Sequence, residues 1–258
     1  MQNLFHTMGP KNIDTLYNVF PDPLLPFGIF DEAWDHFVLS DDKEPLELDA
    51  NRLNRGFLRF LDKRCGGFKN KKVLELGPFE GFHSYDLDRM GVSELLAIEG
   101  NPRNYLKCLI VKNHYQLNSV QFRLGNFVDY LLETDKTYDF ILAAGVLYHS
   151  AKPMVLLEQI IAKTNSFGVC NTFYDPDNLV FRMTGRTREF AIEGIAPITL
   201  HERFNVPHVT RKAKHGMGDS AWMISREDLL RYLEFKNFQV EIRESKKPAR
   251  MQLFAERR

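Results

Sequence analysis

A glutamate and two glycines in one short segment have the types and spacing of a ligand-binding turn. They lie in Val73-Leu-Glu75-Leu-Gly77-Pro-Phe-Glu-Gly81, where an apolar run predicts a strand, Lys72–Leu76, that enters a helix through a tight turn. Glycines at such a turn let a ligand approach the backbone at the carboxyl edge of a sheet. Glu75 could accept hydrogen bonds from an ammonium group. The alternative is a tight turn that binds nothing.

The same turn lacks the features of two common phosphate-binding motifs. Phe79 stands where a dinucleotide-binding G-x-G-x-x-G motif has its second glycine, and no Gly-Lys-Ser/Thr follows as in a Walker A loop. A nicotinamide-dependent oxidoreductase is therefore disfavoured. A ligand with an ammonium group and no phosphates fits better, and the methionine end of S-adenosylmethionine has this chemistry.

Three further candidates follow the next two predicted strands. Glu99 ends the strand Leu95–Glu99, about two dozen residues after Glu75, where an acidic side chain can accept from both hydroxyls of a ribose. Asn126 and Phe127 follow the strand Val120–Leu124 and could offer an amide to the edge of adenine and a ring to its face. Glu99 could instead be an ordinary strand-end glutamate, and Phe127 could be part of the core.

In these positions the chain resembles the class I S-adenosylmethionine-dependent methyltransferases, over roughly residues 55–258. That family has an E/D-x-G-x-x-x-G turn, an acidic residue ending the second strand, an acidic or amide residue after the third, and a reversed last strand. The matching residues here are Glu75, Gly77, Gly81, Glu99 and Asn126, the last in place of the more frequent Asp. The resemblance implies S-adenosylmethionine as the cofactor.

A narrower resemblance lies in Gly145-Val-Leu-Tyr148-His149-Ser-Ala-Lys-Pro153 and Trp222-Met-Ile-Ser225. These segments look like those of the tRNA wobble-uridine carboxymethyl transferases and their relatives. His149 is the candidate base because an unperturbed imidazole titrates near neutral pH, although it could merely bond a neighbouring backbone group. Tyr148 and Tyr174 could bind acceptor or cofactor, or could simply pack. Trp222 is expected to fix a lid over the substrate.

A basic stretch follows the fifth predicted strand. No acidic residue lies between Arg203 and Gly218, and the stretch includes Arg203, His208, Arg211, Lys212, Lys214 and His215. If it covers the site, it favours an anionic acceptor such as a carboxylate, a phosphate or a nucleotide-linked sugar. A solvated loop is the alternative. Asp175, Asp177 and Asn178 could hold a metal, but Ala143-Ala144-Gly145 supply no matching carboxylate, so no metal is expected.

The elements that must position these residues predict an α/β fold. It has a Rossmann-like parallel sheet with a reversed C-terminal strand, helices on both faces, and N-terminal and inserted lid elements. The remaining predicted strands are Phe140–Ala144, Gly168–Phe173, Gln239–Arg243 and Met251–Ala255, and the helices include Pro102–Tyr115, Met154–Lys163 and Leu229–Phe235 capped at Ser225. We divide the chain into a cap over 1–55 and a methyltransferase domain over 56–258 with an insertion at 175–221.

Composition narrows the functional class. The 258 residues carry 34 Lys and Arg against 34 Asp and Glu, and this neutrality disfavours a dedicated nucleic-acid binder. The apolar run Phe140–Tyr148 is too short to cross a bilayer, and three separated cysteines suggest a reducing compartment. We expect a cytoplasmic enzyme that methylates a small O- or N-acceptor, with no membrane partner. The alternatives are an RNA-modifying methyl or carboxymethyl transferase and a non-catalytic module that binds the cofactor.

Overall fold

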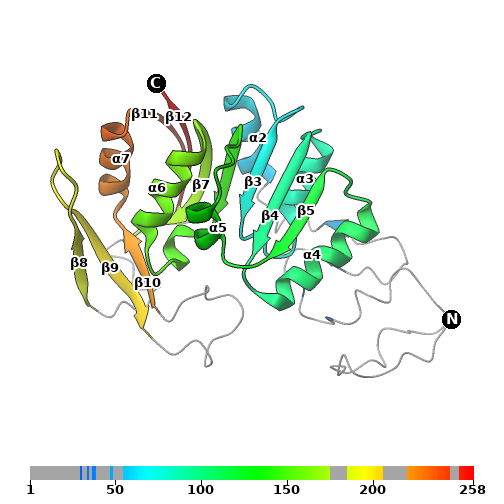
Figure 1. Cartoon of the computed structure of the whole chain (residues 1–258), viewed down its shortest axis with the longest axis horizontal. Coiled ribbons are helices and arrows are strands. Elements are labelled where there is room, and N and C mark those ends of the chain that lie inside the picture. The colour runs from blue at the N-terminus through cyan, green and yellow to red at the C-terminus, as the bar shows by residue number, and fades with distance from the viewer. Residues whose placement is uncertain are drawn as a thin grey trace.

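A seven-stranded mixed sheet forms the centre of the computed structural model (Figure 1). The structure describes residues 30, 34, 37–38, 47–48, 55–174, 185–205, 220–244 and 250–258. The strand order is β11-β12-β7-β6-β3-β4-β5. The strands are β3 (Lys72–Leu76), β4 (Glu94–Glu99), β5 (Val120–Leu124), β6 (Phe140–Ala144), β7 (Ser166–Thr172), β11 (Phe238–Glu244) and β12 (Arg250–Arg257).

The reversed C-terminal strand is confirmed. β3 to β7 are mutually parallel, whereas β12 runs antiparallel to both of its neighbours, β7 and β11. The short connection between β11 and β12 allows only this pairing, since a parallel return needs a crossover of a dozen or more residues. The chain passes from β3 through β4 to β5 on one side and then returns to β6 on the other side of β3. The order in which the chain adds strands therefore reverses between β3 and β6. Open α/β sheets bind ligands at the carboxyl ends of the strands at such a reversal.

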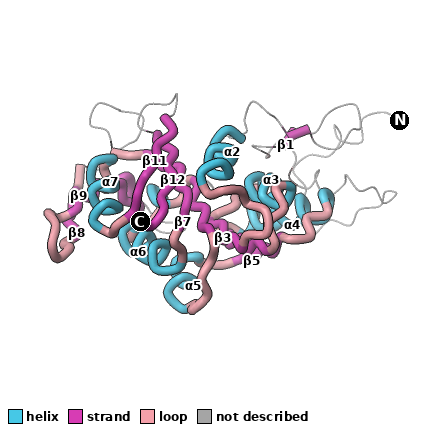
Figure 2. The backbone as a smooth tube through the Cα atoms, turned by 90° about the horizontal axis from the view of Figure 1, so that it is seen from above, coloured by secondary structure: helices cyan, strands magenta, loops and turns pink. Residues whose placement is uncertain are grey.

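Helices cover both faces of the sheet, as predicted (Figure 2). One face packs against α2 (Arg55–Arg64), α3 (Phe82–Arg89) and α4 (Pro102–Tyr115) through a core that includes Leu61, Leu87 and Val111. The other face packs against α5 (Phe127–Glu133), α6 (Pro153–Lys163) and α7 (Arg226–Phe235). Central strands such as β3 are consequently buried on both sides, while the edge strand β5 alternates between buried and exposed positions.

Local sequence signals explain where several helices begin. Asn101 caps α4 by accepting from the backbone N–H groups of Arg103 and Asn104, and Pro102 occupies the first turn. Ser225 caps α7 by accepting from the backbone N–H of Asp228, which confirms the predicted cap. The predicted bounds of β3, β5, β6 and α4 match the structure, whereas β7 begins two residues earlier than predicted, at Ser166.

A second sheet of three antiparallel strands lies beside α6 and α7 (Figure 1). It contains β8 (Thr187–Phe190), β9 (Ile198–Asn205) and β10 (Ser220–Ile224), in the order β10-β9-β8. The sequence did not reveal β10, which extends beyond the predicted end of the insertion at residue 221 and includes Trp222. We call these three strands the inserted sheet. Its role as a lid stays a prediction.

Only a small part of the predicted cap is described. β1 (Phe37–Val38) pairs antiparallel with β2 (Glu47–Leu48), and the side chains of Phe30 and Trp34 are buried. Several residues singled out above lie outside the described part of the chain: Asp175, Asp177, Asn178, His208, Arg211, Lys212, Lys214 and His215.

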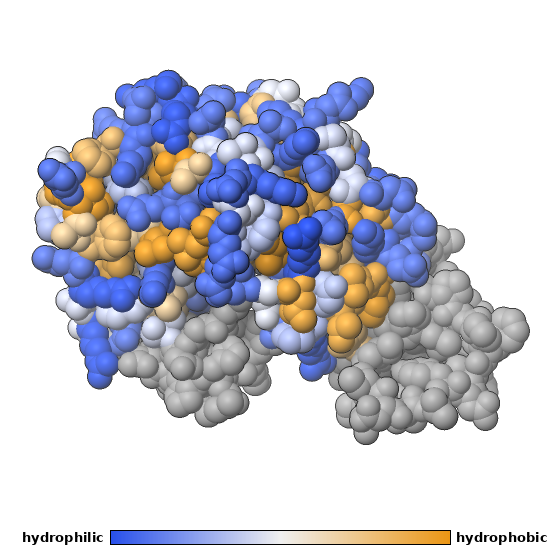
Figure 3. Space-filling model, in the orientation of Figure 1, coloured by the Kyte–Doolittle hydropathy of each residue, from blue (hydrophilic) through white to orange (hydrophobic). Residues whose placement is uncertain are grey.

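Apolar side chains also reach the surface of α4. Leu106 and Leu109 lie three positions apart and are each more than a third exposed, and Leu124 at the end of β5 is half exposed. Figure 3 shows apolar surface over α4.

Among the described helices none combines the length and the apolar composition that a bilayer crossing demands. The described residues also contain no group of three or more His, Cys, Asp or Glu suited to a metal ion.

Candidate active site

The glycine turn, residues 77–81, follows β3 at the point where the strand order reverses. Gly77 (φ 66°) and Gly81 (φ 81°) both have left-handed backbone conformations, which favour glycine. A Cβ atom on Gly77 would lie 2.9 Å from Cγ1 of Val146, which follows β6. The turn after β3 and the loop after β6 are therefore packed against each other. Gly77 is needed for this packing as well as for any approach of a ligand.

Glu75 is buried next to this turn with half of its carboxylate unpartnered. The side chain is 1% exposed, and its Oε2 accepts a hydrogen bond from the hydroxyl of Ser84 on α3. Oε1 has no hydrogen-bond partner, and Nδ1 of His83 lies 3.7 Å away, too far for a hydrogen bond. A buried carboxylate oxygen normally has a donor, so Oε1 has the properties of a group that receives one from a ligand.

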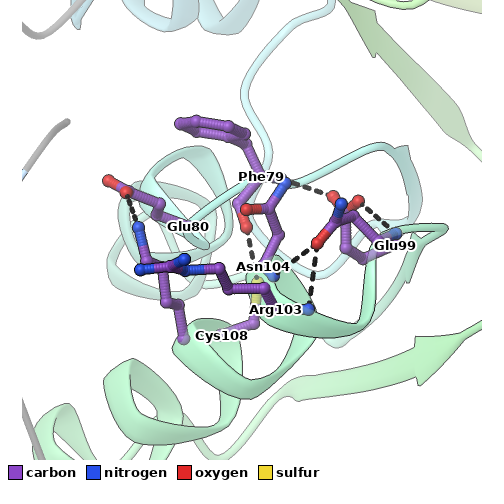
Figure 4. Close-up of polar contacts among 8 residues, drawn as sticks. Phe79, Glu80, Glu99, Arg103, Asn104 and Cys108 are labelled. Carbon is purple, nitrogen blue, oxygen red and sulfur yellow. Dashed lines mark hydrogen bonds and ion pairs between the residues drawn. The ribbon is translucent and has the colours of Figure 1, made fainter. Parts of the chain in front are cut away.

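The Glu99 side chain, at the end of β4, accepts a hydrogen bond from the backbone of the glycine turn (Figure 4). Its Oε2 accepts from the backbone N–H of Phe79 at 2.9 Å, and Oε1 accepts from that of Asn101 at 2.8 Å. Burial raises the pKa of Glu99, and the hydrogen bonds from Asn101 and Phe79 oppose that rise. A hydrogen bond from the side chain of Asn104 opposes it as well. A carboxylate has about four lone-pair sites, so one is left for a ligand hydroxyl. The Phe79 ring points away from this carboxylate, and its backbone has a left-handed φ of 60°.

A buried ion pair joins the turn to α4. Nζ of Lys107 lies 2.6 Å from Oε1 of Glu80, and both side chains are almost fully buried. The same ammonium lies 4.9 Å from the centre of the Trp34 ring and 5.8 Å from that of Phe30. Aromatic faces attract a cation at these distances. The predicted cap thus contributes two aromatic residues that pack against the ion pair between the glycine turn and α4.

Asn126 and Phe127 lie in different environments. Asn126 is exposed and caps α5: its side-chain oxygen accepts from the backbone N–H of Val128, and its Nδ2 donates to Asp129. Phe127 is buried, and its Cε1 lies 4.0 Å from the position that a Cβ on Gly77 would take. Phe127 is therefore next to the glycine turn, whereas the Asn126 amide already serves the helix.

The loop after β6 forms a short 3-10 helix, η1 (Leu147–His149), that packs against β10 of the inserted sheet and meets β9 through Arg203. Nη1 of Arg203 donates to the backbone oxygen of Tyr148 at 3.2 Å and lies 3.3 Å from Nδ1 of His149. The guanidinium also lies 4.9 Å from the centre of the Tyr148 ring. Burial lowers the pKa of Arg203, but an arginine stays charged at neutral pH. The structure thus brings three of the predicted residues together.

Tyr174 and Trp222 contact other partners on the inserted sheet. The Tyr174 ring stacks on His201 with a centroid distance of 3.5 Å, and burial lowers the pKa of that histidine. Trp222 is 9% exposed and packs against the guanidinium of Arg188, 4.1 Å from its ring centre. The backbone N–H groups of Trp222 and Tyr174 donate to the carbonyls of Ser150 and Ile224, respectively. These bonds connect the inserted sheet to the loops after β6 and β7.

Asn171 is a residue that the sequence did not single out. It lies on β7, is 1% exposed, and neither its Nδ2 nor its Oδ1 has a hydrogen-bond partner. The alternation of the strand places it on the same face as Val169, three residues before Tyr174. An asparagine within an apolar strand run was the only available signal, and such a residue is ordinarily bonded when buried.

Comparisons with known proteins agree with this architecture. No family model matches the chain. Over 115 residues the chain is 25% identical to the tRNA U34 carboxymethyltransferase of Campylobacter hominis. This matched stretch covers 44% of this chain and 40% of that protein. Over 177 residues it is 23% identical to the protein of the same name from Campylobacter lari, which covers 64% of this chain and 58% of that one. The chain thus spans about half the length of these curated relatives.

Solved structures match more of the chain. The N-terminal domain of EvdMO1, crystallised in the presence of S-adenosylhomocysteine (SAH) and D-fucose, superposes with a TM-score of 0.64 at 18% identity, over 88% of this chain and 92% of that one. An S-adenosylmethionine-dependent methyltransferase from Mesorhizobium loti superposes with a TM-score of 0.52 at 11% identity, over 79% and 96%. The predicted resemblance is confirmed at the level of the fold: this chain has the Rossmann-like fold of the S-adenosylmethionine-dependent methyltransferases.

Proposed function

We propose that this protein is an S-adenosylmethionine-dependent methyltransferase that acts on a small, anionic acceptor. The observation that carries the proposal is the buried Glu75, whose Oε1 lacks a donor beside a glycine turn at the switch point of the sheet. An ammonium group is the natural partner for such an oxygen. The fold shared with structures that contain SAH supports the same assignment.

The residues around the turn fit the parts of this cofactor. Glu75 would accept from its ammonium group, and Glu99 would accept from a ribose hydroxyl while its bonds from Phe79, Asn101 and Asn104 keep the carboxylate in place. Phe127 would pack against the adenine, since it lies beside Gly77, and Asn126 would act mainly through the start of α5. When bound, the cofactor supplies a methyl group that its sulfonium already activates.

The acceptor would lie between η1 and the inserted sheet. Tyr148, His149 and Arg203 meet there, and Arg203 supplies a positive charge in a half-buried position. Charge-assisted hydrogen bonds from a guanidinium favour carboxylate and phosphate groups. Because the leaving group is already activated, these residues would contribute chiefly by orienting the acceptor. Tyr174 and Trp222 would line or support this part of the site from the neighbouring loops.

A second candidate is an RNA-modifying methyl or carboxymethyl transferase, since the curated relatives carry that name. The equal numbers of basic and acidic residues weigh against it. Binding of tRNA whose affinity falls steeply as the salt concentration rises would favour this second candidate over a small acceptor.

Calorimetric titration tests the proposed cofactor directly. The purified protein is titrated in parallel with S-adenosylmethionine, SAH and NAD. We expect saturable binding of the first two and none of NAD. Glu75→Gln should weaken both interactions, whereas Arg123→Met, at the far edge strand β5, should leave them unchanged. Binding of NAD alone, or equal affinity in the Glu75→Gln protein, would refute the assignment.

A further inference from the structure

Two consecutive residues of α3 approach the two oxygens of the buried Glu75 carboxylate. The hydroxyl of Ser84 donates to Oε2, whereas Nδ1 of His83 lies 3.7 Å from Oε1 without bonding it. The glycine turn brings the first turn of α3 back beside Glu75 in this way. The His83 side chain is 19% exposed and that of Glu75 is 1% exposed. The imidazole can therefore exchange protons with solvent while the carboxylate stays buried.

The gap between His83 and Glu75 suits a donor that both groups share. A carboxylate oxygen only accepts, and a neutral imidazole with its proton on Nε2 has a lone pair on Nδ1. An ammonium group has three N–H donors. It can reach two acceptors that lie about 4 Å apart, because each charge-assisted contact is about 2.8 Å long. The ammonium end of the proposed cofactor has this geometry.

The charges around the gap favour a cation there. Burial raises the pKa of Glu99 at the end of β4, and the nearby Glu75 carboxylate adds to that rise. On α4, Lys107 is paired with Glu80. Other ionisable side chains on the helices beside the gap have contacts away from His83: Asp62, Arg64, Asp88, Arg89 and Cys108. Among these described contacts, Glu75 is the charged group that bears on His83 most directly.

We propose that His83 is a second cofactor-binding residue, whose neutral imidazole accepts a hydrogen bond from the same ammonium group as Glu75. The inference rests on the proposed function, because it concerns the ammonium end of S-adenosylmethionine. An imidazolium has no lone pair, so a protonated His83 cannot accept; it repels the ammonium and donates to Oε1 in its place. Cofactor affinity should therefore fall as the pH falls through the range in which imidazoles gain a proton, about pH 8 to 5.

Calorimetric titration with SAH at about pH 7.5 and about pH 5.5 tests this dependence. We expect the affinity of the wild type to be about tenfold lower at the lower pH, as for a linked titration displaced by one unit. His83→Gln keeps an acceptor and cannot titrate, so it should bind nearly as well as the wild type at the higher pH and lose the pH dependence. His83→Leu should bind about tenfold more weakly at the higher pH.

The matched control is His114→Gln, in the last turn of α4, which should keep both the affinity and the pH dependence of the wild type. A dependence that persists in His83→Gln would belong to Glu99 and would overturn the proposal, as would an affinity that does not change with pH. Normal binding of SAH to His83→Leu would refute this inference alone. No binding of SAH to the wild type at either pH would refute the cofactor assignment and this inference with it.

NMR of the full chain gives a second measurement that needs no turnover. The ring resonances of His83 are assigned by comparison with His83→Gln and followed over pH with and without SAH. Because linkage is reciprocal, these resonances should change at a lower pH in the SAH-loaded protein than in the free protein. A change at the same pH in both states would show that the imidazole does not contact the ammonium.

Discussion

Replacing two buried glutamates, one just before the glycine turn and one within it, should change the free energy of unfolding in opposite directions. Glu75 is 1% exposed and has one unpartnered oxygen, whereas Glu80 is 0% exposed and is paired with Lys107 at 2.6 Å. The same change, Glu→Gln, removes a charge without changing the shape of either side chain. The two variants therefore separate a carboxylate that awaits a ligand from one that the fold has already paired.

The expected magnitudes follow from these partners. Glu75→Gln keeps an acceptor for Ser84 and buries a neutral amide in place of a charge, so the free energy of unfolding without ligand should rise by about 1 kcal/mol. Glu80→Gln leaves the Lys107 ammonium without its counter-charge and should lower the free energy of unfolding by about 3 kcal/mol. This value is at the low end for a broken buried pair because the amide oxygen still accepts a hydrogen bond. For a chain of this size, 1 kcal/mol corresponds to about 2–4 °C in Tm.

Cofactor affinity should behave differently from stability. A lost charged hydrogen bond of about 1.5–3 kcal/mol predicts that Glu75→Gln weakens binding of SAH by about 10- to 150-fold. Calorimetry gives the Kd, and thermal unfolding with and without SAH gives the stability of each state. SAH should raise the Tm of the wild-type protein by more than it raises the Tm of the Glu75→Gln variant. If Glu75→Gln destabilises the free protein as Glu80→Gln does, or binds SAH normally, Glu75 is a structural residue and the reasoning fails.

Three further substitutions have defined outcomes. Gly77→Ala should lower both stability and cofactor affinity, because its Cβ would meet Val146 at 2.9 Å and φ is 66°; a stable variant that only binds weakly would contradict this packing role. Burial raises the pKa of Glu99 above its ordinary value of 4.5, so its contribution to stability is present below the unfolded pKa and is lost as the pH rises through the folded pKa. In urea unfolding, the free energy of unfolding of the wild type minus that of Glu99→Gln should be more positive at about pH 4 than at about pH 7. Asn171→Leu should raise the unfolding free energy by about 1–3 kcal/mol, since it removes an unpartnered buried amide; a loss of stability would show that the amide is bonded within the folded protein.

Much of the fold could be predicted because its signals are local. The apolar runs of β3, β5 and β6 are bounded by turn residues, and their predicted bounds match the structure. The cap at Ser225 depends on two positions three residues apart, which are visible in any sequence. β10 was missed because its run, Ser220–Ile224, is short, directly precedes a helix cap, and pairs with a strand that the sequence did not reveal either. The length of such a run alone cannot identify a strand without its partner.

The candidate site divides in the same way. The closeness of Glu75 and Glu99 to the glycine turn could be predicted, because both lie at the carboxyl ends of neighbouring parallel strands and such ends meet at one edge. Their roles toward a ligand stay predictions. The pairing of Lys107 with Glu80 and that of Arg203 with His149 join residues far apart in the chain, so neither leaves a local pattern. Asn126 has the expected position but serves as a helix cap, a role that its residue type equally favours. Whether it also contacts adenine stays a prediction.

The attachment of the inserted sheet bears on how this protein could acquire new substrates. Backbone atoms form much of the connection, since the N–H of Trp222 donates to Ser150 and that of Tyr174 donates to Ile224. Such bonds do not depend on side-chain identity. Substitutions on β9, including those at Arg203, can therefore alter the surface that we propose for the acceptor while the strands stay in register and Glu75 and Glu99 stay untouched. Directed evolution for a different acceptor would best begin by randomising this one strand.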